Sequence, residues 1–198
     1  MRDQKPDPVI HSFFTNQNIE FEEHAMHQYM VDIPTALNFE IKYSMHMNSI
    51  RFTFIFQIVG LSLPDDVYVT SLERCHAATV FNNWLFKATT TIEHVEDELD
   101  RLPSAGLFLK QTDQLVCMVM GYPPNGMSRM FTLDEYRGRG YARLAIHYIS
   151  KRMAQCGLVP FGNINTKNVN SVKCFQGAGF RNYRMVSVLL KYPSAALG

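Results

Sequence analysis

The chain has 198 residues, a hydrophobic content of 46%, an aromatic content of 12% and a formal net charge of +1. This length fits one domain, or one domain with a substantial extension, and the composition excludes a disordered chain. The charge shows no long run of one sign and no apolar run is long enough to span a bilayer, so we expect neither nucleic-acid nor membrane partners.

The four cysteines lie far apart in the sequence and form no Cys-x-x-Cys pair. This spacing fits reduced thiols in an intracellular protein better than a disulfide framework or a zinc site. The first eight residues contain no apolar signal region and are too acidic for a typical mitochondrial transit peptide, so cytoplasmic localisation is the default expectation. The cysteines are Cys75, Cys117, Cys156 and Cys174.

Residues 1–48 show no sustained hydrophobic period, and we assign them no role. His24 and His27 form a His-x-x-His pair without further clustered ligands, so we interpret the pair as an exposed helical face and predict no metal site. Apolar and polar residues alternate from Ile50 to Ile58, as is typical of a half-buried strand. A Leu-Pro-Asp-Asp turn follows, and we expect an N-terminal extension over 1–60 and a core domain over 61–198.

Two capping boxes come next in the chain. Thr70 with Glu73 precedes one helical apolar face, and Thr90 with Glu93 precedes another. We therefore expect two short capped helices before the main sheet.

The remaining elements alternate between strands and helices. Three apolar runs separated by turn residues predict an antiparallel meander over Gly106–Lys110, Leu115–Met120 and Met127–Leu133. Apolar residues at helical spacing then predict a long helix from Tyr141 to Cys156, which Gly157 ends. A strand over Leu158–Ile164, a helix after Asn168 and a last strand within Phe180–Tyr192 follow.

The segment between the third meander strand and the long helix has the features of an anion site. Gly138 and Gly140 let the backbone bend closely around a ligand, and the first N–H groups of the following helix have no intrahelical partners. Together with the helix dipole these groups favour a phosphate. Arg137, Arg139 and Arg143 add positive charge. The alternative is a tight strand-to-helix turn with surface arginines.

Two known phosphate-binding patterns do not fit this segment. The chain contains no Gly-x-x-x-x-Gly-Lys-Ser/Thr run, and a Gly-x-Gly-x-x-Gly fingerprint starting at Gly138 would need a glycine where Arg143 stands. A third pattern, Arg/Gln-x-x-Gly-x-Gly/Ala, is met by Arg137, Gly140 and Ala142. It resembles the pyrophosphate-binding signature of the GNAT superfamily of acyl-CoA-dependent N-acyltransferases.

Two further stretches carry the same resemblance. The run from Asn168 to Phe180 is similar to the superfamily's Asn-x-x-Ala/Ser helix that closes with Gly-Phe. The wording Thr-Leu-x-Glu-Tyr-Arg-Gly-x-Gly from Thr132 onward resembles the glycine N-acyltransferase-like branch. In that branch an N-terminal half precedes the catalytic half, and here it would be shortened. The branch also leaves the mitochondrial matrix open as a location.

The resemblance implies a fold, a co-substrate and a binding site. The fold would be α/β, with a mixed, mostly antiparallel central sheet and helices on both faces. The co-substrate would be acyl-CoA, either acetyl-CoA or a longer or aromatic acyl-CoA, without a metal. The strand before the loop would pair with the pantetheine arm through its backbone. The residues that would bind CoA are Phe131, Thr132, Leu133, Arg137, Gly138, Arg139, Gly140, Tyr141, Ala142, Arg143, Asn168 and Ser171.

The resemblance also suggests catalytic roles. Glu135 is the candidate general base, with Asp134 as the fallback; the alternative is a solvated acid that pairs with a neighbouring arginine. Many superfamily members carry a tyrosine as general acid where this chain has Phe175, and Tyr141 is a possible substitute. Cys174 next to Phe175 is more simply a buried, inert thiol than a covalent nucleophile.

The acceptor is less well defined than the acyl donor. In the superfamily the helices before the meander border the acceptor pocket, so Trp84 and Phe86 would either line it or pack in the core. We expect transfer of the acyl group to the amino group of a small molecule, with glycine or another amino acid as candidates. A non-catalytic acyl-CoA-binding module and a protein amine acetyltransferase are the alternatives. The sequence does not indicate the oligomeric state.

Overall fold

The computed structural model describes residues 21–37, 41–44, 55–58, 63–122 and 126–191. The strands are β1 (Phe21–Met30), β2 (Ile41–Ser44), β3 (Ile55–Ile58), β4 (Val67–Thr70), β5 (Ser104–Leu109), β6 (Leu115–Tyr122), β7 (Gly126–Thr132), β8 (Phe161–Asn165) and β9 (Arg181–Lys191). The α-helices are α2 (Ile33–Leu37), α3 (Ala77–Asn82), α4 (Ile92–Arg101), α5 (Tyr141–Gln155) and α6 (Val169–Gly177). Short 3-10 turns are η1 (Arg74–His76), η2 (Lys87–Thr89) and η3 (Asp134–Tyr136).

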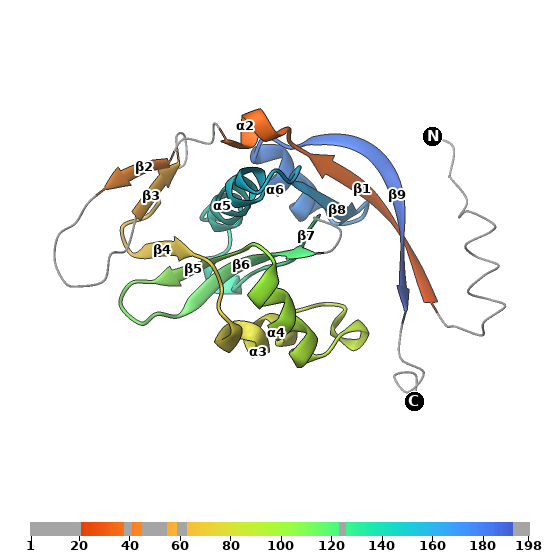
Figure 1. Cartoon of the computed structure of the whole chain (residues 1–198), viewed down its shortest axis with the longest axis horizontal. Helices are drawn as coiled ribbons and strands as arrows, with labels where there is room; N and C mark the ends of the chain where they lie inside the picture. Colours follow the sequence, from red (N-terminus) through yellow and green to blue (C-terminus); the bar gives the residue numbers. More distant parts are fainter. Residues whose placement is uncertain (1–20, 38–40, 45–54, 59–62, 123–125, 192–198) are drawn as a thin grey trace.

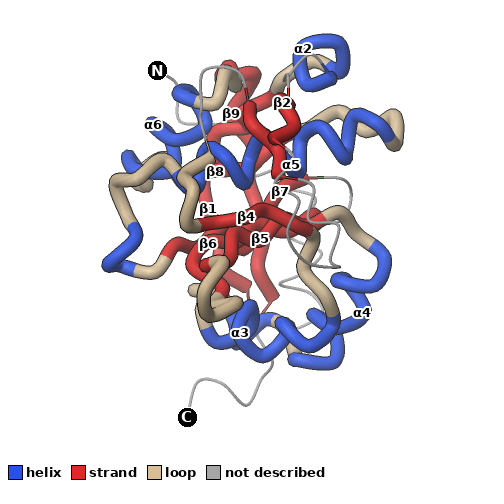
Figure 2. Tube along the Cα trace, turned by 90° about the vertical axis from the view of Figure 1, so that its left-hand side faces the viewer, coloured by secondary structure: helices blue, strands red, loops and turns tan. Residues whose placement is uncertain are grey.

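A seven-stranded sheet in the order β4-β5-β6-β7-β8-β1-β9 forms the centre of the fold, and β2 pairs with β3 separately. Adjacent strands of the seven-stranded sheet are antiparallel, except for β7 and β8, which are parallel. Helices α5 and α6 cover one face, and α3 and α4 cover the other (Figure 1). Figure 2 shows the same two layers of helix around the sheet from the side. The predicted mixed, mostly antiparallel sheet with helices on both faces is confirmed.

The core is divided by the sheet into two clusters. One lies between the sheet and α5, where Ile149 and Met153 have no exposed surface. The other lies between the sheet and α3 and α4, where Val80 and Val95 have none. Helical spacing of apolar residues on α5 therefore corresponds to one buried face, as the sequence predicted.

Strand β1 lies in the interior of the sheet, although the first 48 residues gave no sign of a strand. It pairs with β9 along its length and with β8 from Met26 to Met30 (Figure 1). Tyr29 is buried beside Phe175 of α6, with ring centroids 6.4 Å apart. His24 and His27 lie in this strand, so their interpretation as a helical face is wrong. The proposed boundary near residue 60 stays a prediction, but β1 belongs to the same sheet as the later strands.

The predicted meander is confirmed as β5, β6 and β7, and the long helix as α5. Gly157 ends α5 in the left-handed region at φ 73°. The last helix and strand are confirmed as α6 and β9. The predicted strand over Ile50–Ile58 is β3 in its last four residues, and its earlier part lies outside the described residues.

Three predicted boundaries are wrong. Thr70 ends β4 instead of capping a helix, and Glu73 is the N-cap of η1. Thr91, not Thr90, caps α4, because its side chain accepts a hydrogen bond from the His94 N–H. The strand predicted from Leu158 begins only at Phe161, after Pro160, which has no N–H to donate.

We expect the α5-side core to carry much of the stability. Ile149→Ala should lower the free energy of unfolding by about 2–5 kcal/mol, because it leaves a cavity at a position with no exposed surface. Leu85→Ala, at a side chain that is 83% exposed, should change it by no more than about 0.5 kcal/mol. Urea unfolding monitored by circular dichroism measures both, and equal losses would contradict this assignment of the core.

Candidate functional site

The parallel strands β7 and β8 separate soon after they meet. They pair only at Gly126 with Phe161 and at Met127 with Gly162. Strand β7 then continues to Thr132 with β6 as its partner, and Thr132 lies opposite Cys117. The side of β7 that faces away from β6 therefore has backbone hydrogen-bonding groups without a strand partner over its last residues. An extended ligand with amide groups can pair there as a further strand would.

A bulge in β7 lies at the point of separation. Met118 of β6 opposes Phe131, and Met120 opposes Ser128, so Arg129 and Met130 together face one residue of β6. Arg129 adopts φ 51°, a left-handed conformation that is uncommon outside glycine. The bulge bends the strand at this position. An arginine within a strand gives no sequence signal for a bulge, so the sequence did not predict one here.

The glycine loop connects the end of β7 to α5. Gly138 and Gly140 adopt φ 77° and 82°, and Gly140 is the N-cap of α5. A Cβ atom added at Gly138 would meet no atom within 4 Å, so the loop has open space beside it. The Arg143 N–H donates to the Gly140 carbonyl at 3.1 Å, so the N–H groups of Tyr141 and Ala142, without a partner among the described residues, and the helix dipole are what favour an anion here. The loop has room for an anion, and the anion site stays a prediction.

Two of the predicted arginines contact the loop itself. The Nε atom of Arg137 donates to the Thr132 carbonyl at 3.1 Å, and its Nη2 atom pairs with Asp134 at 2.6 Å. The Nη2 atom of Arg139 donates to the Glu135 carbonyl at 3.1 Å. These contacts tie the exposed loop to the end of β7.

Arg143 and Ala142 lie on the first turn of α5. A Cβ atom added at Gly177 of α6 would lie 3.2 Å from the Arg143 Cδ atom, so this side chain extends toward α6. Ala142 packs against the α5-side core. Of the three arginines, two therefore surround the loop and one reaches the neighbouring helix.

The strand residues predicted to bind through their backbone divide between the two cores. Phe131 packs with the α4-side cluster and Leu133 with the α5-side cluster. The Leu133 N–H donates to the Val116 carbonyl of β6 at 3.0 Å, so it is not free for a ligand. Because N–H groups alternate along a strand, the Thr132 N–H faces the opening toward β8.

The two carboxylates of the loop differ in their partners. Asp134 is 81% exposed and pairs with Arg137. Glu135 is also exposed, and among the described residues no ion pair engages its carboxylate. The neighbouring Arg139 contacts the backbone carbonyl of Glu135 instead. In the part of the chain that the structure describes, the Glu135 carboxylate at the end of β7 is therefore unpaired. Its role as a general base stays a prediction.

Helix α6 begins as the sequence predicted. The Asn168 side chain accepts a hydrogen bond from the Ser171 N–H at 3.0 Å. Phe175 is 4% exposed and packs edge-on against Phe180, with centroids 5.1 Å apart. Tyr141 is 2% exposed and stacks on Tyr136 at 6.3 Å. Phe175 is therefore a core residue, and Tyr141 is held in a ring stack.

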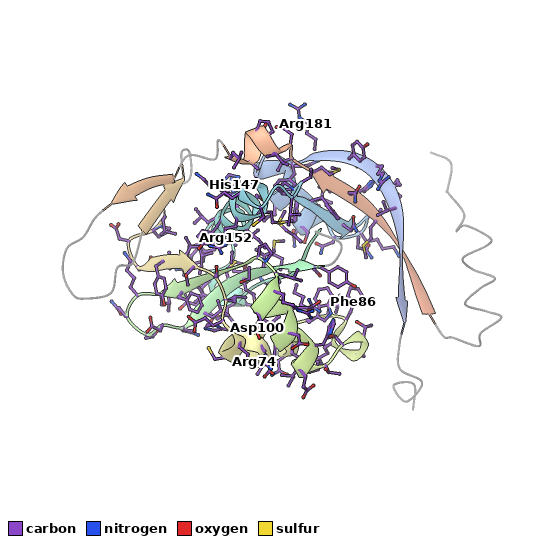
Figure 3. The ribbon with its side chains drawn as sticks, in the orientation of Figure 1. Arg74, Phe86, Asp100, His147, Arg152 and Arg181 are labelled. Atoms are coloured by element: carbon purple, nitrogen blue, oxygen red, sulfur yellow. The ribbon has the colours of Figure 1, made fainter. Side chains whose placement is uncertain are left out.

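The rings of Trp84 and Phe86 lie on the opposite face of the sheet from α5. Both side chains are half-buried, and they meet edge to face with centroids 5.4 Å apart. Figure 3 labels Phe86 on the side of α3 and α4. The Arg129 guanidinium lies 5.5 Å from the centroid of the Trp84 ring, so this pair of aromatic residues contacts the bulge.

Within the described ranges, no group of three or more His, Cys, Asp and Glu side chains could hold a metal ion. In the same ranges, no helix combines the length and the apolar character needed to cross a membrane.

Two thiols near the site, the buried Cys117 and the half-buried Cys174, lack the properties of nucleophiles. The Cys117 Sγ atom accepts a hydrogen bond from the Thr132 hydroxyl at 3.2 Å, and burial raises the pKa of this thiol to about 12. Burial likewise raises the pKa of Cys174 to about 11. Since the thiolate is the reactive form, both groups are inert near neutral pH.

Alkylation should separate the four thiols. At pH 8, iodoacetamide should modify the exposed Cys75 and Cys156 at least about a hundredfold faster than Cys117 and Cys174, because a raised pKa removes thiolate at a given pH. Peptide mass spectrometry measures each rate. Rapid labelling of Cys174 in the folded protein would contradict its assignment as an inert thiol and favour a role as a covalent nucleophile.

The comparisons with known proteins agree with this fold. The family model described as FR47-like protein matches residues 104–188. Among curated protein sequences, none gives a significant match. A crystal structure of a Drosophila protein is similar, with a TM-score of 0.73 and 14% identity; the alignment covers 93% of this chain and 56% of that one.

Two bacterial structures are also similar. A GCN5-related N-acetyltransferase from Sphaerobacter thermophilus has a TM-score of 0.58 and 10% identity, and the alignment covers 96% of this chain and 59% of that one. A GNAT-family acetyltransferase from Colwellia psychrerythraea has a TM-score of 0.52 and 12% identity, over 93% and 62% of the two chains. This chain thus spans little more than half the length of the Drosophila protein, and it has the fold of the GNAT acetyltransferases.

Proposed function

We propose that this chain transfers an acyl group from acyl-CoA to the amino group of a small molecule. The observation that carries the proposal is the separation of β7 from β8 directly before the glycine loop. Coenzyme A combines a thin pantetheine arm that contains amides with a pyrophosphate. The free edge of β7 suits the first, and the N-terminus of α5 suits the second.

The proposed reaction is a direct attack on the thioester. The acceptor amine loses a proton to Glu135, directly or through a water, and its nitrogen forms a bond to the thioester carbon. The oxyanion of the tetrahedral intermediate accepts a hydrogen bond from a free β7 amide, for which the Thr132 N–H is the candidate. The C–S bond then breaks, and the electron pair leaves with the sulfur.

The leaving thiolate needs little assistance. A thiol of ordinary pKa, about 8.5, yields a thiolate that is a good leaving group near neutral pH. The buried Phe175 ring, which cannot donate a proton, therefore slows the proposed reaction without preventing it.

The comparisons support the acyl donor more than the acceptor. The GNAT structures are described as acetyltransferases, which favours acetyl-CoA or a related acyl-CoA as co-substrate. Glycine or another amino acid is the acceptor we propose, on the basis of the Thr-Leu-x-Glu-Tyr-Arg wording that ends in Arg137.

The second candidate is a non-catalytic acyl-CoA-binding protein. Phe175 favours it, because the position that supplies a proton in many relatives here belongs to the core. A binding protein would hold acyl-CoA at the same site as the acyltransferase but would not transfer the acyl group, so binding and turnover must be measured separately.

Binding of acyl-CoA to the glycine loop is the first test. A hundredfold excess of acetyl-CoA over its Kd should stabilise the wild type by about 2.7 kcal/mol, which thermal unfolding detects as a rise in Tm. Gly140→Asp should remove the rise, because it places a carboxylate at the N-terminus of α5 and strains φ 82°.

Gly157→Asp is the matched control. It lies at the other end of α5, at φ 73° and with nothing within 4 Å of an added Cβ atom, so it imposes a similar backbone strain away from the loop. It should lower Tm but keep the shift caused by acetyl-CoA. If both variants keep the shift, the ligand does not bind in the loop.

Replacement of Glu135 tests the catalytic proposal. With acetyl-CoA or benzoyl-CoA and glycine, Glu135→Gln should lower kcat by about 10²–10⁴-fold and leave the acyl-CoA-induced Tm shift unchanged, because only the proton acceptor is lost. Release of CoA thiol measures turnover.

Asp134→Asn provides the comparison, because this neighbouring carboxylate already pairs with Arg137. A larger loss for Asp134→Asn than for Glu135→Gln would transfer the role of base to Asp134. Binding of acyl-CoA without turnover of any amine in a panel would favour the non-catalytic candidate.

A further inference from the structure

The left-handed bulge of β7 is held by a buried ion pair. The Arg129 Nη1 atom lies 2.6 Å from the Glu98 Oε2 atom of α4, and the two side chains are 2% and 3% exposed. His94, one turn earlier on α4, lies 3.4 Å from the other Glu98 oxygen. The ion pair therefore joins α4 to the residue at which β7 bends.

Two aromatic rings enclose the guanidinium. Its Cζ atom lies 5.5 Å from the centroid of the Trp84 ring and 5.7 Å from that of the Tyr122 ring. A planar guanidinium stacks on aromatic rings in a way that a lysine ammonium cannot. The loop after α3, the end of β6 and helix α4 thus all contact one side chain of β7.

Folding stability alone does not explain this buried ion pair. The Arg129 Nη1 and Glu98 Oε2 atoms lie 2.6 Å apart but are not aligned as a hydrogen bond, and among the described residues the buried Arg129 Nε atom has no hydrogen-bonding partner. A buried pair with incomplete hydrogen bonding is often no more stabilising than apolar side chains of similar volume. A non-glycine residue in the left-handed region adds a further cost of about 1–3 kcal/mol.

The position of the bulge explains what the pair can contribute. Gly126 and Met127, which precede Ser128 and the bulge, pair with β8, and the residues after the bulge do not. The free amides of β7 begin at this bend. A shift of the bend would change the direction of every amide that faces the opening, because one residue of slippage turns a strand over.

We propose that Arg129 is a positioning residue, held by Glu98, that fixes the β7 bulge and thereby the backbone amides that face the acyl thioester. This inference rests on the proposed function, since it assigns the ion pair a part in the same reaction. It also connects the α4 side of the sheet, which carries Trp84, to the strand that would hold the acyl group.

Two double variants distinguish positioning from packing. Glu98→Leu with Arg129→Met removes both buried charges, roughly fills the volume and keeps the strained φ of 51°. Glu98→Leu with Arg129→Gly removes more packing but supplies a residue that adopts this φ without strain. Positioning therefore predicts that the glycine variant works better than the methionine variant, and packing predicts the reverse.

The expected effect on turnover is large and specific. The methionine variant should lose about 10–100-fold in kcat, because small misplacements of reacting groups have effects of this order. Its acetyl-CoA-induced Tm shift should remain. The glycine variant should have a kcat at least about threefold higher than that of the methionine variant. A methionine variant equal to or better than the glycine variant would overturn the proposal.

Arg74→Met, in η1, is the matched control, because it removes another ion pair to the same helix. Arg74 pairs with Glu96 and Asp100 of α4, at 2.6 and 2.7 Å, but its side chain is 52% exposed. Figure 3 shows it at the lower edge of α3 and α4, away from β7. Exposed pairs contribute little, so kcat should stay within about twofold of the wild type. A loss as large as that of the methionine variant would mean that only the docking of α4 matters and would overturn the proposal.

Hydrogen exchange tests the bulge without turnover. In the peptide covering 126–133, exchange should be about tenfold faster in the methionine variant than in the wild type and in Arg74→Met, because the bend is no longer fixed. Equal exchange overturns the proposal, whether or not the wild type is active. A wild type that transfers nothing but shows the expected exchange would refute the proposed function and leave the role of Arg129 in the bulge supported.

Discussion

The separation of β7 from β8 is the constraint on which the rest of the structure depends. Two parallel strands that pair for two residues and then part leave one edge of each without a partner. Strand β6 continues to pair with β7 as far as Thr132, and β1 pairs with β8 over all of its residues, Phe161–Asn165. Each strand therefore keeps one full partner, and the sheet stays intact around an opening. The N-terminal strand β1 is needed for this arrangement, since without it β8 would pair with only two residues of β7.

Three left-handed residues then control the direction of the chain from β7 to α5. Arg129 bends the strand, and Gly138 and Gly140 turn the loop into the helix. Glycine adopts this conformation without a Cβ penalty, but arginine needs contacts that compensate for the strain. Glu98, Trp84 and Tyr122 supply such contacts, and they come from elements distant in sequence. The loop is thus fixed by local chemistry, whereas the bulge is fixed by tertiary packing.

This difference explains what the sequence could predict. The glycine loop, α5 and the helix after Asn168 depend on neighbours within a few residues, and all three were predicted. Strand β4 was missed because Thr70 and Glu73 also fit a capping box, although Thr70 pairs with Gly106 across the sheet. Strand β1 was missed because its partners are more than 130 residues away. The ion pair of Arg129 with Glu98 could not be predicted either, since no local pattern shows that two charged residues from a helix and a strand will be buried together.

The charges of the loop point to backbone groups as the main anion donors. Arg137 already binds Asp134 and the Thr132 carbonyl, and Arg139 binds the Glu135 carbonyl. Both arginines hold the loop in shape, and a ligand would need to share them. The N–H groups of the first α5 turn are already oriented and need no reorganisation to receive a negative charge. An anion in this loop would therefore be held chiefly by the start of α5, with the arginines fixing the loop that leads to it and only partly neutralising the charge.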